Sequence, residues 1–222
     1  MKRTRFSARF ILFDWDGTLL NSYDADIRAY ITMFRAFGIE WGPKELARHY
    51  SPNWYRVYTA ARLARAHWSK ADVLWGRAYR NEKPGLLPGA KQVLTVLQSS
   101  FILGIVTSGN RARVRRQLRE FDLDRYFSAR ICSEDAAKRK PHPAPLRTAL
   151  ANLRARPDEC IYVGDTAEDV QMARRAGVRA IGVLGPFPTA ERLRAARPEA
   201  LLRSIRELPR YVRPTADSND CP

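Results

Sequence analysis

Two acidic segments, about 150 residues apart in this chain of 222 residues, carry the residue types best suited to phosphoryl chemistry. The first, Asp14-Trp-Asp-Gly-Thr18, follows the apolar run 10–13, and the second, residues 164–169, follows the apolar run 161–163. Each run is expected to form a buried strand, so each segment places carboxylates at a strand end. Such like charges require a cation, and carboxylate oxygens suit Mg²⁺, which often binds beside phosphate. Because a carboxylate can also attack phosphorus as a nucleophile, the pattern predicts metal-assisted phosphoryl transfer through an aspartyl-phosphate.

A hydroxyl group and an ammonium group lie in two further segments. Thr107 comes directly after the apolar run 101–106, and Lys140 opens the segment Lys140-Pro-His-Pro143. A dianionic phosphate beside a metal requires such donors. A lone acidic segment is also typical of a turn after a strand, because Asp and Gly favour turns. Four such segments in this order are difficult to attribute to turns.

With these segments the chain resembles the haloacid dehalogenase-like superfamily, and within it the phosphoglycolate-phosphatase-like members with a helical cap. The resemblance extends from about residue 10 to about residue 210 and includes all four motifs of that superfamily. It implies a nucleophile, a general acid and base, two groups that bind the phosphate oxygens, and a final acidic pair: Asp14, Asp16, Thr107 with Lys140, and Asp165 with Asp169.

The resemblance also implies a Mg²⁺ site. The metal would be bound by Asp14, by Asp165 and by the main-chain carbonyl of Asp16. Asp169 would not bind the metal directly but would hold water molecules or Lys140 next to these ligands. We therefore expect the acidic groups of both segments to act together as one metal centre.

The residues beside the phosphate-binding motifs are expected to contact the substrate. Gly17 in the first motif has no side chain and so permits the backbone to approach the substrate closely. The segment after Thr107 begins a predicted helix, whose free N–H groups favour an anion. Its Asn also suits the N-cap position of that helix. We expect Glu168 to face solvent. The substrate-binding residues expected here are Gly17, Thr18, Ser108, Gly109 and Asn110.

Two departures from the family pattern bear on access to the site. Trp15 stands where a smaller apolar residue is usual, and Arg139 stands where Gly is common. In the helical region, residues 51–56 interrupt the helical pattern and resemble in position a cap loop over the active site, although Ser51 replaces a common Gly. Arg56 in this loop is expected to bind a second anionic group of the substrate, such as a carboxylate.

The formal charge of +16 is the main observation that favours another class of function. A basic surface can bind nucleic acid. However, the basic residues are spread along the chain, and in the densest group Arg111, Arg115 and Arg119 would form the outer stripe of a helix. We interpret the charge as a solvated surface, with only salt-sensitive, non-specific binding of polyanions.

No apolar run approaches the ~20 residues of a membrane span. Basic residues before the apolar run 10–13 resemble the start of a signal peptide, but this run is too short and no small-residue cleavage site follows it. We therefore predict a cytoplasmic protein. The three cysteines form neither a metal pattern nor a disulfide framework. We expect Cys132 and Cys160 to be core residues and Cys221 to be exposed in a polar tail. No catalytic role is assigned to the three histidines, His49, His67 and His142.

Helical and strand patterns alternate between residues 89 and 184, which predicts a parallel sheet covered by helices. Ligands of such sheets bind beyond the carboxyl ends of the strands, which places the motif residues at one edge. The resemblance adds the strand order 5-4-1-2-3. The expected fold is a doubly wound α/β core, residues 1–21 and 84–212, with an inserted helical cap, residues 22–83. Ser69–Asp72 is expected to cap the last cap helix, and residues 213–222 to be a disordered tail.

The function predicted from these patterns is Mg²⁺-dependent hydrolysis of a small phosphorylated metabolite, with phosphoglycolate or a sugar phosphate as the nearest substrates. A phosphosugar mutase and a pyrophosphatase of the same superfamily remain alternatives, although no His follows the first motif, where such mutases carry one. A dehalogenase is disfavoured because Asp16 is present. The alternative from another class is a non-catalytic polyanion-binding protein on the same scaffold. We predict no specific nucleic-acid partner and no membrane; the oligomeric state stays open.

Overall fold

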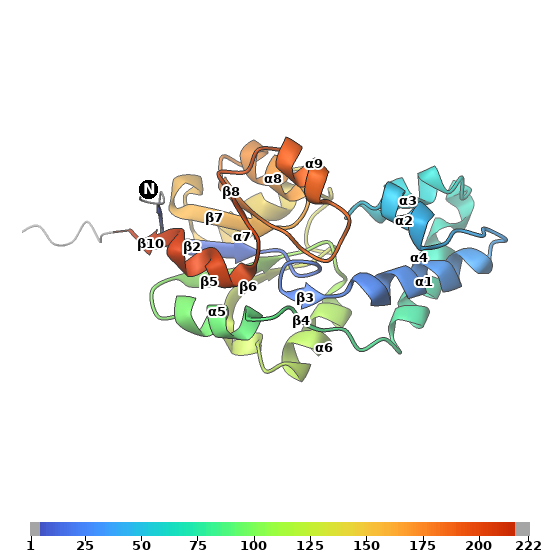
Figure 1. The fold of residues 1–222 in the computed structure, drawn as a ribbon, viewed down its shortest axis with the longest axis horizontal. Helices are drawn as coiled ribbons and strands as arrows, with labels where there is room; N and C mark the ends of the chain where they lie inside the picture. Colours follow the sequence, from blue (N-terminus) through green and yellow to red (C-terminus); the bar gives the residue numbers. More distant parts are fainter. Residues whose placement is uncertain (1–4, 216–222) are drawn as a thin grey trace, which may run out of the picture.

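A six-stranded parallel sheet forms the centre of the computed structural model, which describes residues 5–215 (Figure 1). Its strands have the spatial order β6 (Phe127–Ile131), β5 (Ile102–Val106), β2 (Phe10–Phe13), β7 (Cys160–Gly164), β8 (Arg179–Val183) and β9 (Ala200–Leu202). All neighbouring pairs are parallel. The first five strands in chain order therefore have the arrangement 5-4-1-2-3, which confirms the prediction, and β9 adds a sixth strand beside β8.

Helices cover both faces of this sheet. Because side chains alternate along a strand, Ile11 and Phe13 of β2 face one side while Phe10 and Leu12 face the other. The first face packs against α5 (Ala90–Leu97), α6 (Arg111–Glu120) and the 3₁₀ helix η4 (Ile205–Arg210). The second packs against α7 (Ala144–Leu153), α8 (Ala167–Arg175) and α9 (Ala190–Ala195). The doubly wound α/β class is thereby confirmed.

A short strand pair joins the two ends of the described chain. β1 (Phe6–Ala8) pairs in parallel with β10 (Val212–Pro214). The expected tail therefore does not begin at Arg213, because Arg213 and Pro214 belong to β10 and pair with β1. Residues 216–222, which include Cys221, lie outside the described residues.

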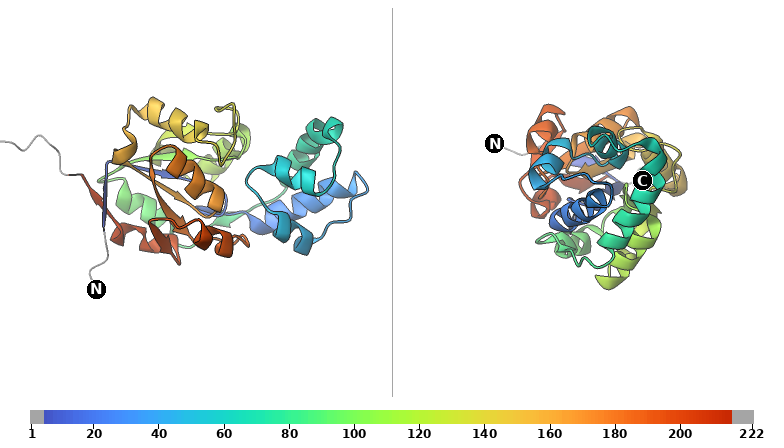
Figure 2. Two further views of the ribbon diagram at one scale, coloured as in Figure 1. Left: turned by 90° about the horizontal axis from the view of Figure 1, so that it is seen from above. Right: turned by 90° about the vertical axis from the view of Figure 1, so that its right-hand side faces the viewer.

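Four helices form a separate packed unit between β3 (Leu20–Asn21) and β4 (Gly85–Leu86), which pair antiparallel. Figures 1 and 2 show this helical unit beyond one edge of the sheet. It has an apolar cluster of its own, rich in aromatic residues. The elements of this helical unit are α1 (Tyr23–Arg35), α2 (Pro43–His49), α3 (Trp54–Ala60), the 3₁₀ turn η1 (Arg65–His67) and α4 (Trp68–Tyr79).

The expected cap at Ser69–Asp72 is wrong in detail. Helix α4 already begins at Trp68, so these residues lie in its first two turns. Asp72 instead accepts hydrogen bonds from the hydroxyls of Tyr55, at 3.3 Å, and Tyr58, at 2.9 Å. Its carboxylate therefore links α4 to α3.

Two simpler expectations concern burial and membranes. Cys132 and Cys160 are buried as predicted. Among the described residues, no helix has the length and apolar character needed to cross a membrane.

Candidate active site

The carboxyl ends of three neighbouring strands bring the motif residues together. Asp14 follows β2, Thr107 follows β5 and Asp165 follows β7, and β2 is the middle strand of these three. The Asp14 N–H donates to the Val163 carbonyl at 2.8 Å, which continues the ladder to the site. The predicted meeting of these residues follows directly from parallel pairing.

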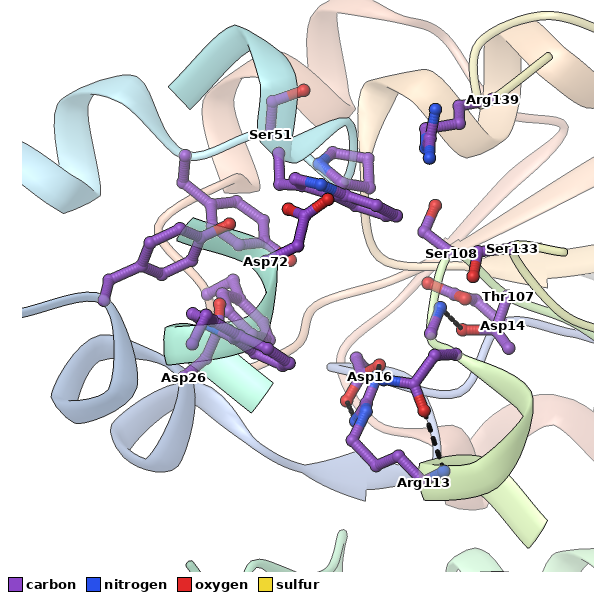
Figure 3. Close-up of a pocket in the computed structure, with 18 of the residues that line it drawn as sticks. Asp14, Asp16, Asp26, Ser51, Asp72, Thr107, Ser108, Arg113, Ser133 and Arg139 are labelled. Atoms are coloured by element: carbon purple, nitrogen blue, oxygen red, sulfur yellow. Dashed lines mark hydrogen bonds and ion pairs between the residues drawn. The ribbon is translucent and has the colours of Figure 1, made fainter. Parts of the chain in front are cut away.

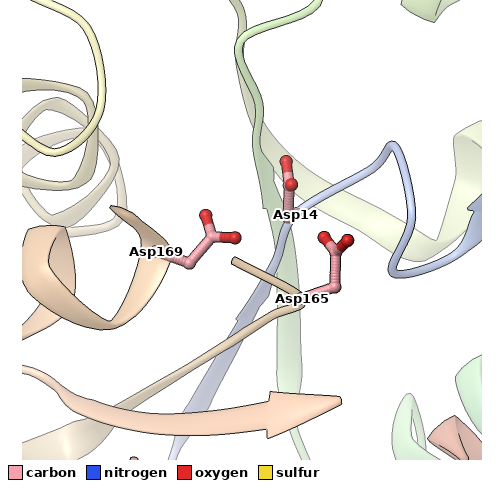
Figure 4. Close-up of side chains that lie close together, drawn as sticks. All are labelled: Asp14, Asp165 and Asp169. Carbon is pink, nitrogen blue, oxygen red and sulfur yellow. The ribbon is translucent and has the colours of Figure 1, made fainter. Parts of the chain in front are cut away.

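Three buried carboxylates form an acidic cluster at this edge (Figure 4). Each of Asp14, Asp165 and Asp169 has a carboxylate oxygen within 4.8 Å of such an oxygen on the others. Burial raises the pKa of Asp165 well above its usual value, and the charges of Asp14 and Asp169 raise it further. One oxygen of Asp165, Oδ2, is buried and has no hydrogen-bond partner among residues 5–215. An orphaned oxygen within a hard-oxygen ligand set fits a divalent cation such as Mg²⁺.

Lys140 lies fully buried between two of these acids. Its Nζ is 2.7 Å from Asp14 Oδ1 and 2.8 Å from Asp169 Oδ1. Burial disfavours its charge, but the two carboxylates outweigh burial, so the pKa of Lys140 lies above its usual value. Burial raises the pKa of Asp14 to about 7, against the opposing effect of Lys140, with a further rise from Asp169. The cation at position 140 is thus fixed in its charged form beside Asp14.

Asp169 is oriented by the start of helix α8. Its Oδ2 accepts hydrogen bonds from the N–H of Thr166, at 3.0 Å, and from the hydroxyl of Thr166, at 2.6 Å. Tyr162 also donates to Asp169, at 3.2 Å. Because these donors hold the carboxylate in place, Asp169 lies in a fixed position beside Lys140.

Asp16 is held by an arginine that the sequence analysis did not select. Arg113 of α6 donates to both carboxylate oxygens of Asp16, at 2.8 and 2.6 Å. Burial would raise the pKa of Asp16, but the charge and hydrogen bonds of Arg113 outweigh burial, so the pKa lies below its usual value. The only hint in the sequence is that Arg113 falls off the outer stripe, which three of the four other arginines on this helix form. Asp16 is therefore ionised in this arrangement.

The residues next to Asp16 support the acidic cluster from behind. Gly17 has a φ of +78°, and a Cβ there would lie 2.3 Å from Asp165 Oδ2, so the turn requires Gly. Thr18 is buried and donates to Asp165 Oδ1 at 3.2 Å. Trp15 is also buried, and its indole N–H donates to Gln117 at 2.9 Å. Trp15 therefore belongs to the core and does not alter access to the site.

The segment after β5 forms the opposite wall. The Thr107 hydroxyl accepts from the N–H of Gly109 at 3.0 Å. Asn110 caps α6 by accepting from the Arg113 N–H at 2.9 Å, in agreement with its expected N-cap role. Ser108 lines the same wall. Hydroxyl and backbone N–H groups at a helix N-terminus suit a phosphate.

A cavity of about 320 Å³ lies between this edge and the helical unit (Figure 3). The core contributes Asp14, Asp16 and the wall after β5. The helical unit contributes mainly aromatic rings, together with two carboxylates that the sequence analysis did not select, Asp26 and Asp72. The aromatic residues of the wall are Tyr30, Tyr50, Trp54, Tyr58, Trp75 and Phe187, the last of which comes from the core.

Arg139 is the departure from the family pattern that reaches the cavity. Its guanidinium lies over the rings of Trp54, at 4.2 Å, and Tyr55, at 4.4 Å. Arg56, in contrast, is largely exposed and lies 3.8 Å from Glu168. The structure thus places Arg139 at the cavity and Arg56 outside its lining.

Glu168 is buried, so the expectation that it faces solvent is wrong. The hydroxyl of Ser51 donates to Glu168 at 3.1 Å, and Arg56 is its ion-pair partner. The physical reason is that the helical unit docks on the start of α8 and covers this acid. Glu168 therefore joins the helical unit to the core.

The comparisons with known proteins decide the family. The sequence profile of the haloacid dehalogenase-like hydrolases matches residues 11–183, more than half of the chain. The chain belongs to this family. The predicted resemblance and the prediction of an enzyme that hydrolyses its substrate are thereby confirmed.

Curated relatives of similar length carry two kinds of name. The chain is 29% identical over 204 residues to pyrophosphatase PpaX of Anoxybacillus flavithermus, with 89% of this chain and 94% of the relative covered. It is 26% identical over 215 residues to a phosphoglycolate phosphatase of Photorhabdus laumondii, with 90% of each covered. Both names fit the phosphatase chemistry expected from the motifs.

Solved structures show the same fold. A haloacid dehalogenase-like family hydrolase from Streptococcus pneumoniae has a TM-score of 0.82 at 23% identity, covering 92% of this chain and 98% of its own. CbbY from Rhodobacter sphaeroides in complex with phosphate has a TM-score of 0.77 at 22% identity, covering 90% and 96%.

Proposed function

We propose that this hydrolase is a Mg²⁺-dependent phosphatase that hydrolyses a small phosphomonoester through an aspartyl-phosphate on Asp14. The observation that carries the proposal is the placement of Lys140, 2.7 Å from Asp14 and 2.8 Å from Asp169, beside the acidic cluster. This arrangement supplies a nucleophile, a fixed cation and a metal ligand set within one buried edge. Such groups neutralise a phosphoryl group while a carboxylate attacks it.

The metal would be held by Asp14, Asp165 and the main-chain carbonyl of Asp16. Bound Mg²⁺ would neutralise phosphate charge next to the nucleophile. Lys140 and the Thr107 hydroxyl would hold the phosphate oxygens, and Ser108 and Gly109 line the cavity next to Thr107. Asp169 positions Lys140 and is not itself a reacting group.

Asp16 is proposed as the acid and base of the two steps. In the first step, Asp14 attacks phosphorus and Asp16 gives a proton to the leaving oxygen. In the second, Asp16 accepts a proton from the water that attacks the aspartyl-phosphate. Since Arg113 keeps Asp16 ionised, the arrangement seen here matches the second step, and the first requires a weaker Arg113 contact.

The proposal includes a division of the chain into two domains. The core would comprise residues 1–21 and 84–212, and the cap residues 22–83, with the β3–β4 pair at the two connections. The separate apolar cluster of the helical unit supports this division. The cap would exclude water from the intermediate. A cytoplasmic location stays a prediction.

Asp14→Asn tests the proposal directly. The variant should fold normally, by circular dichroism, and hydrolyse p-nitrophenyl phosphate only at background rate, because the amide is not a nucleophile toward phosphorus. Wild-type activity should vanish on chelation and return with Mg²⁺. Near wild-type turnover by Asp14→Asn would eliminate the covalent route, and activity that survives full chelation would eliminate the metal.

Pyrophosphate is the second substrate to assay, because curated relatives at 28–29% identity are named pyrophosphatases. The same assay of released phosphate, with pyrophosphate in place of the ester, distinguishes a phosphomonoesterase from a pyrophosphatase.

A further inference from the structure

The cavity has a distal chamber that the phosphatase chemistry leaves unexplained. We define it by four rings, Tyr30, Trp54, Tyr58 and Trp75, and two carboxylates, Asp26 and Asp72. Figure 3 shows Asp26 on α1 and Asp72 on α4 at one end of the cavity, with Asp14 and Thr107 at the other. A phosphate held beside Asp14 would therefore direct its leaving group into this chamber.

Neither chamber carboxylate has an ion-pair partner within 4.0 Å among residues 5–215. Asp72 accepts from the hydroxyls of Tyr55 and Tyr58, which are neutral donors. Burial raises the pKa of Asp26 to about 8, with a further rise from the charge of Asp16 and an opposing effect of Arg113. Burial likewise raises the pKa of Asp72. A cation or a strong donor in the chamber would relieve the cost of ionising these groups.

The two arginines on the cavity wall do not reverse this charge pattern. Arg113 is occupied by Asp16, at 2.6 Å. Arg139 lines the cavity against the faces of Trp54 and Tyr55, where its charge opposes the rise in the pKa of Asp72, and Figure 3 places it nearer to Ser108 than to Asp26. The end of the cavity far from the phosphate therefore presents carboxylate acceptors and aromatic rings, although Arg139 already lies over one face of Trp54 and Arg113 over one face of Trp75.

Aromatic faces and unpaired carboxylates attract the same chemical group. The negative faces of Trp and Tyr rings bind ammonium groups, and aromatic cages are used for this purpose. A carboxylate adds a charge-assisted hydrogen bond to a primary ammonium. A carboxylate or second phosphate in the same place would make ionisation of Asp26 and Asp72 costlier still, and either group once ionised would repel it.

We infer that the leaving group of the substrate carries an amino group at the end away from the phosphate, bound between Asp26 and Asp72 in the aromatic chamber. This inference rests on the proposed phosphatase function and narrows its substrate class to phosphate esters of amino alcohols or amino sugars. Phosphoglycolate and pyrophosphate, whose second group is anionic, become poor substrates.

Two matched series of phosphate esters test the inference. The first is glucosamine 6-phosphate, glucose 6-phosphate and 6-phosphogluconate; the second is phosphoethanolamine, 2-hydroxyethyl phosphate and phosphoglycolate. Within a series the size is similar, and the group far from the phosphate is cationic, neutral or anionic. In at least one series, kcat/KM should fall from cation to neutral to anion, by about tenfold or more between the extremes.

Charge-neutral variants then assign the preference to the chamber. Asp26→Asn and Asp72→Asn keep the side-chain shape and should reduce the ratio of kcat/KM for amine over neutral ester toward unity. Asp24→Asn is the matched control, because Asp24 lies two residues away on the same helix and is exposed. It should retain the wild-type ratio. The thermal midpoint of each variant verifies that the fold is kept.

Three outcomes would overturn the inference. One is equal or better turnover of the anionic member in both series, which would instead assign Arg139 as an anion-binding residue. Another is an amine preference that both Asn variants retain. The third is hydrolysis of p-nitrophenyl phosphate without turnover of either amine, which leaves the phosphatase function intact. If the wild-type protein hydrolysed none of these esters, including p-nitrophenyl phosphate, the proposed phosphatase function would be wrong, and the inference would fall with it.

Discussion

At the scale of single residues, the pair of Asp16 and Arg113 has the largest consequence for the site. Arg113 is almost buried, with 9% of its side chain exposed, and it binds Asp16 through two short hydrogen bonds. A planar guanidinium suits this two-pronged geometry better than an ammonium. Arg113 therefore fixes both the orientation and the charge of the side chain proposed as acid and base.

Replacing Arg113 by Met should lower the free energy of unfolding at neutral pH. Removing one partner of a buried pair costs ~3–5 kcal/mol, and we expect about 3 kcal/mol because 21% of the Asp16 side chain is exposed. Arg113 lowers the pKa of Asp16 in the folded state. This contribution is therefore present above the unfolded pKa of about 4 and is lost as the pH falls through the folded value.

Urea unfolding between about pH 3 and pH 8 measures this effect. The difference between wild type and Arg113→Met should be largest near neutral pH and shrink in acid. Arg115→Met, on an exposed position of the same helix, is the control and should change little. A loss that is independent of pH would mean that Arg113 stabilises by packing alone. The double variant Arg113→Met/Asp16→Asn should lose less free energy of unfolding than the sum of the losses in the two single variants.

At the scale of elements, strand ends were the predictable part of the site. Asp14, Thr107 and Asp165 each follow an apolar run directly, and parallel pairing forces the carboxyl ends of β2, β5 and β7 to the same edge. Their meeting needed no knowledge of side-chain packing. The strand order itself came from the family resemblance and not from the residues.

The part that sequence could not supply depends on how separate elements dock. Arg113 and Arg56 are both arginines on helices near the site, and only packing decides that Arg113 turns inward to Asp16 while Arg56 pairs with Glu168. Asp26 and Asp72 lie on two helices of the helical unit, about 45 residues apart, and meet at a cavity only because α1 packs against α4. Helical periodicity indicates at most that Arg113 lies off the outer stripe of its helix, and neither periodicity nor distance along the chain indicates which residue each of these side chains contacts.

The junction between β7 and α8 makes an element-scale prediction. A Cβ on Gly164 would lie 2.5 Å from Asp169 Cγ, so Gly164→Ala should displace Asp169 from Lys140. Loss of such supporting contacts typically costs ~10–100-fold in metal affinity or activity, and we expect kcat/KM to fall within that range. Steady-state kinetics with a Mg²⁺ titration measures both quantities.

Gly76→Ala is the control for this substitution. A Cβ on Gly76 meets nothing within 4 Å, and Gly76 lies within helix α4. The control should keep wild-type kinetics and gain some stability, because Ala favours helix over Gly by ~1 kcal/mol. Unchanged kinetics in Gly164→Ala would show that Asp169 needs no fixed position.

At the scale of the whole molecule, arginines do more than charge the surface: they also join the core to the helical unit and join elements within the core. The guanidinium of Arg192 on α9 donates to the main-chain carbonyl of Tyr50 at 2.9 Å, and the ring of Tyr50 stacks on Phe187 at 4.3 Å between centroids. Other guanidinium groups bind main-chain carbonyls within the core: Arg174 binds Ala196, and Arg175 binds Pro141. A share of the positive charge thus serves to join elements.

The charge of +16 leads to the last prediction, which concerns nucleic acid. Because its arginines are dispersed and several are occupied by carbonyls or carboxylates, the protein should bind duplex DNA and RNA only through long-range attraction. Such binding carries no sequence preference and has a Kd of ~10⁻⁴–10⁻⁶ M at physiological salt. Electrophoretic shifts of unrelated duplexes at about 50 and 150 mM salt should therefore show equal affinities that weaken together as salt rises. Tight binding at about 150 mM salt that distinguishes one sequence from another would contradict this and favour a polyanion-binding role for the same scaffold. Asp14→Asn provides the matched control, since a change confined to the catalytic edge should leave nucleic-acid binding as weak as in the wild type.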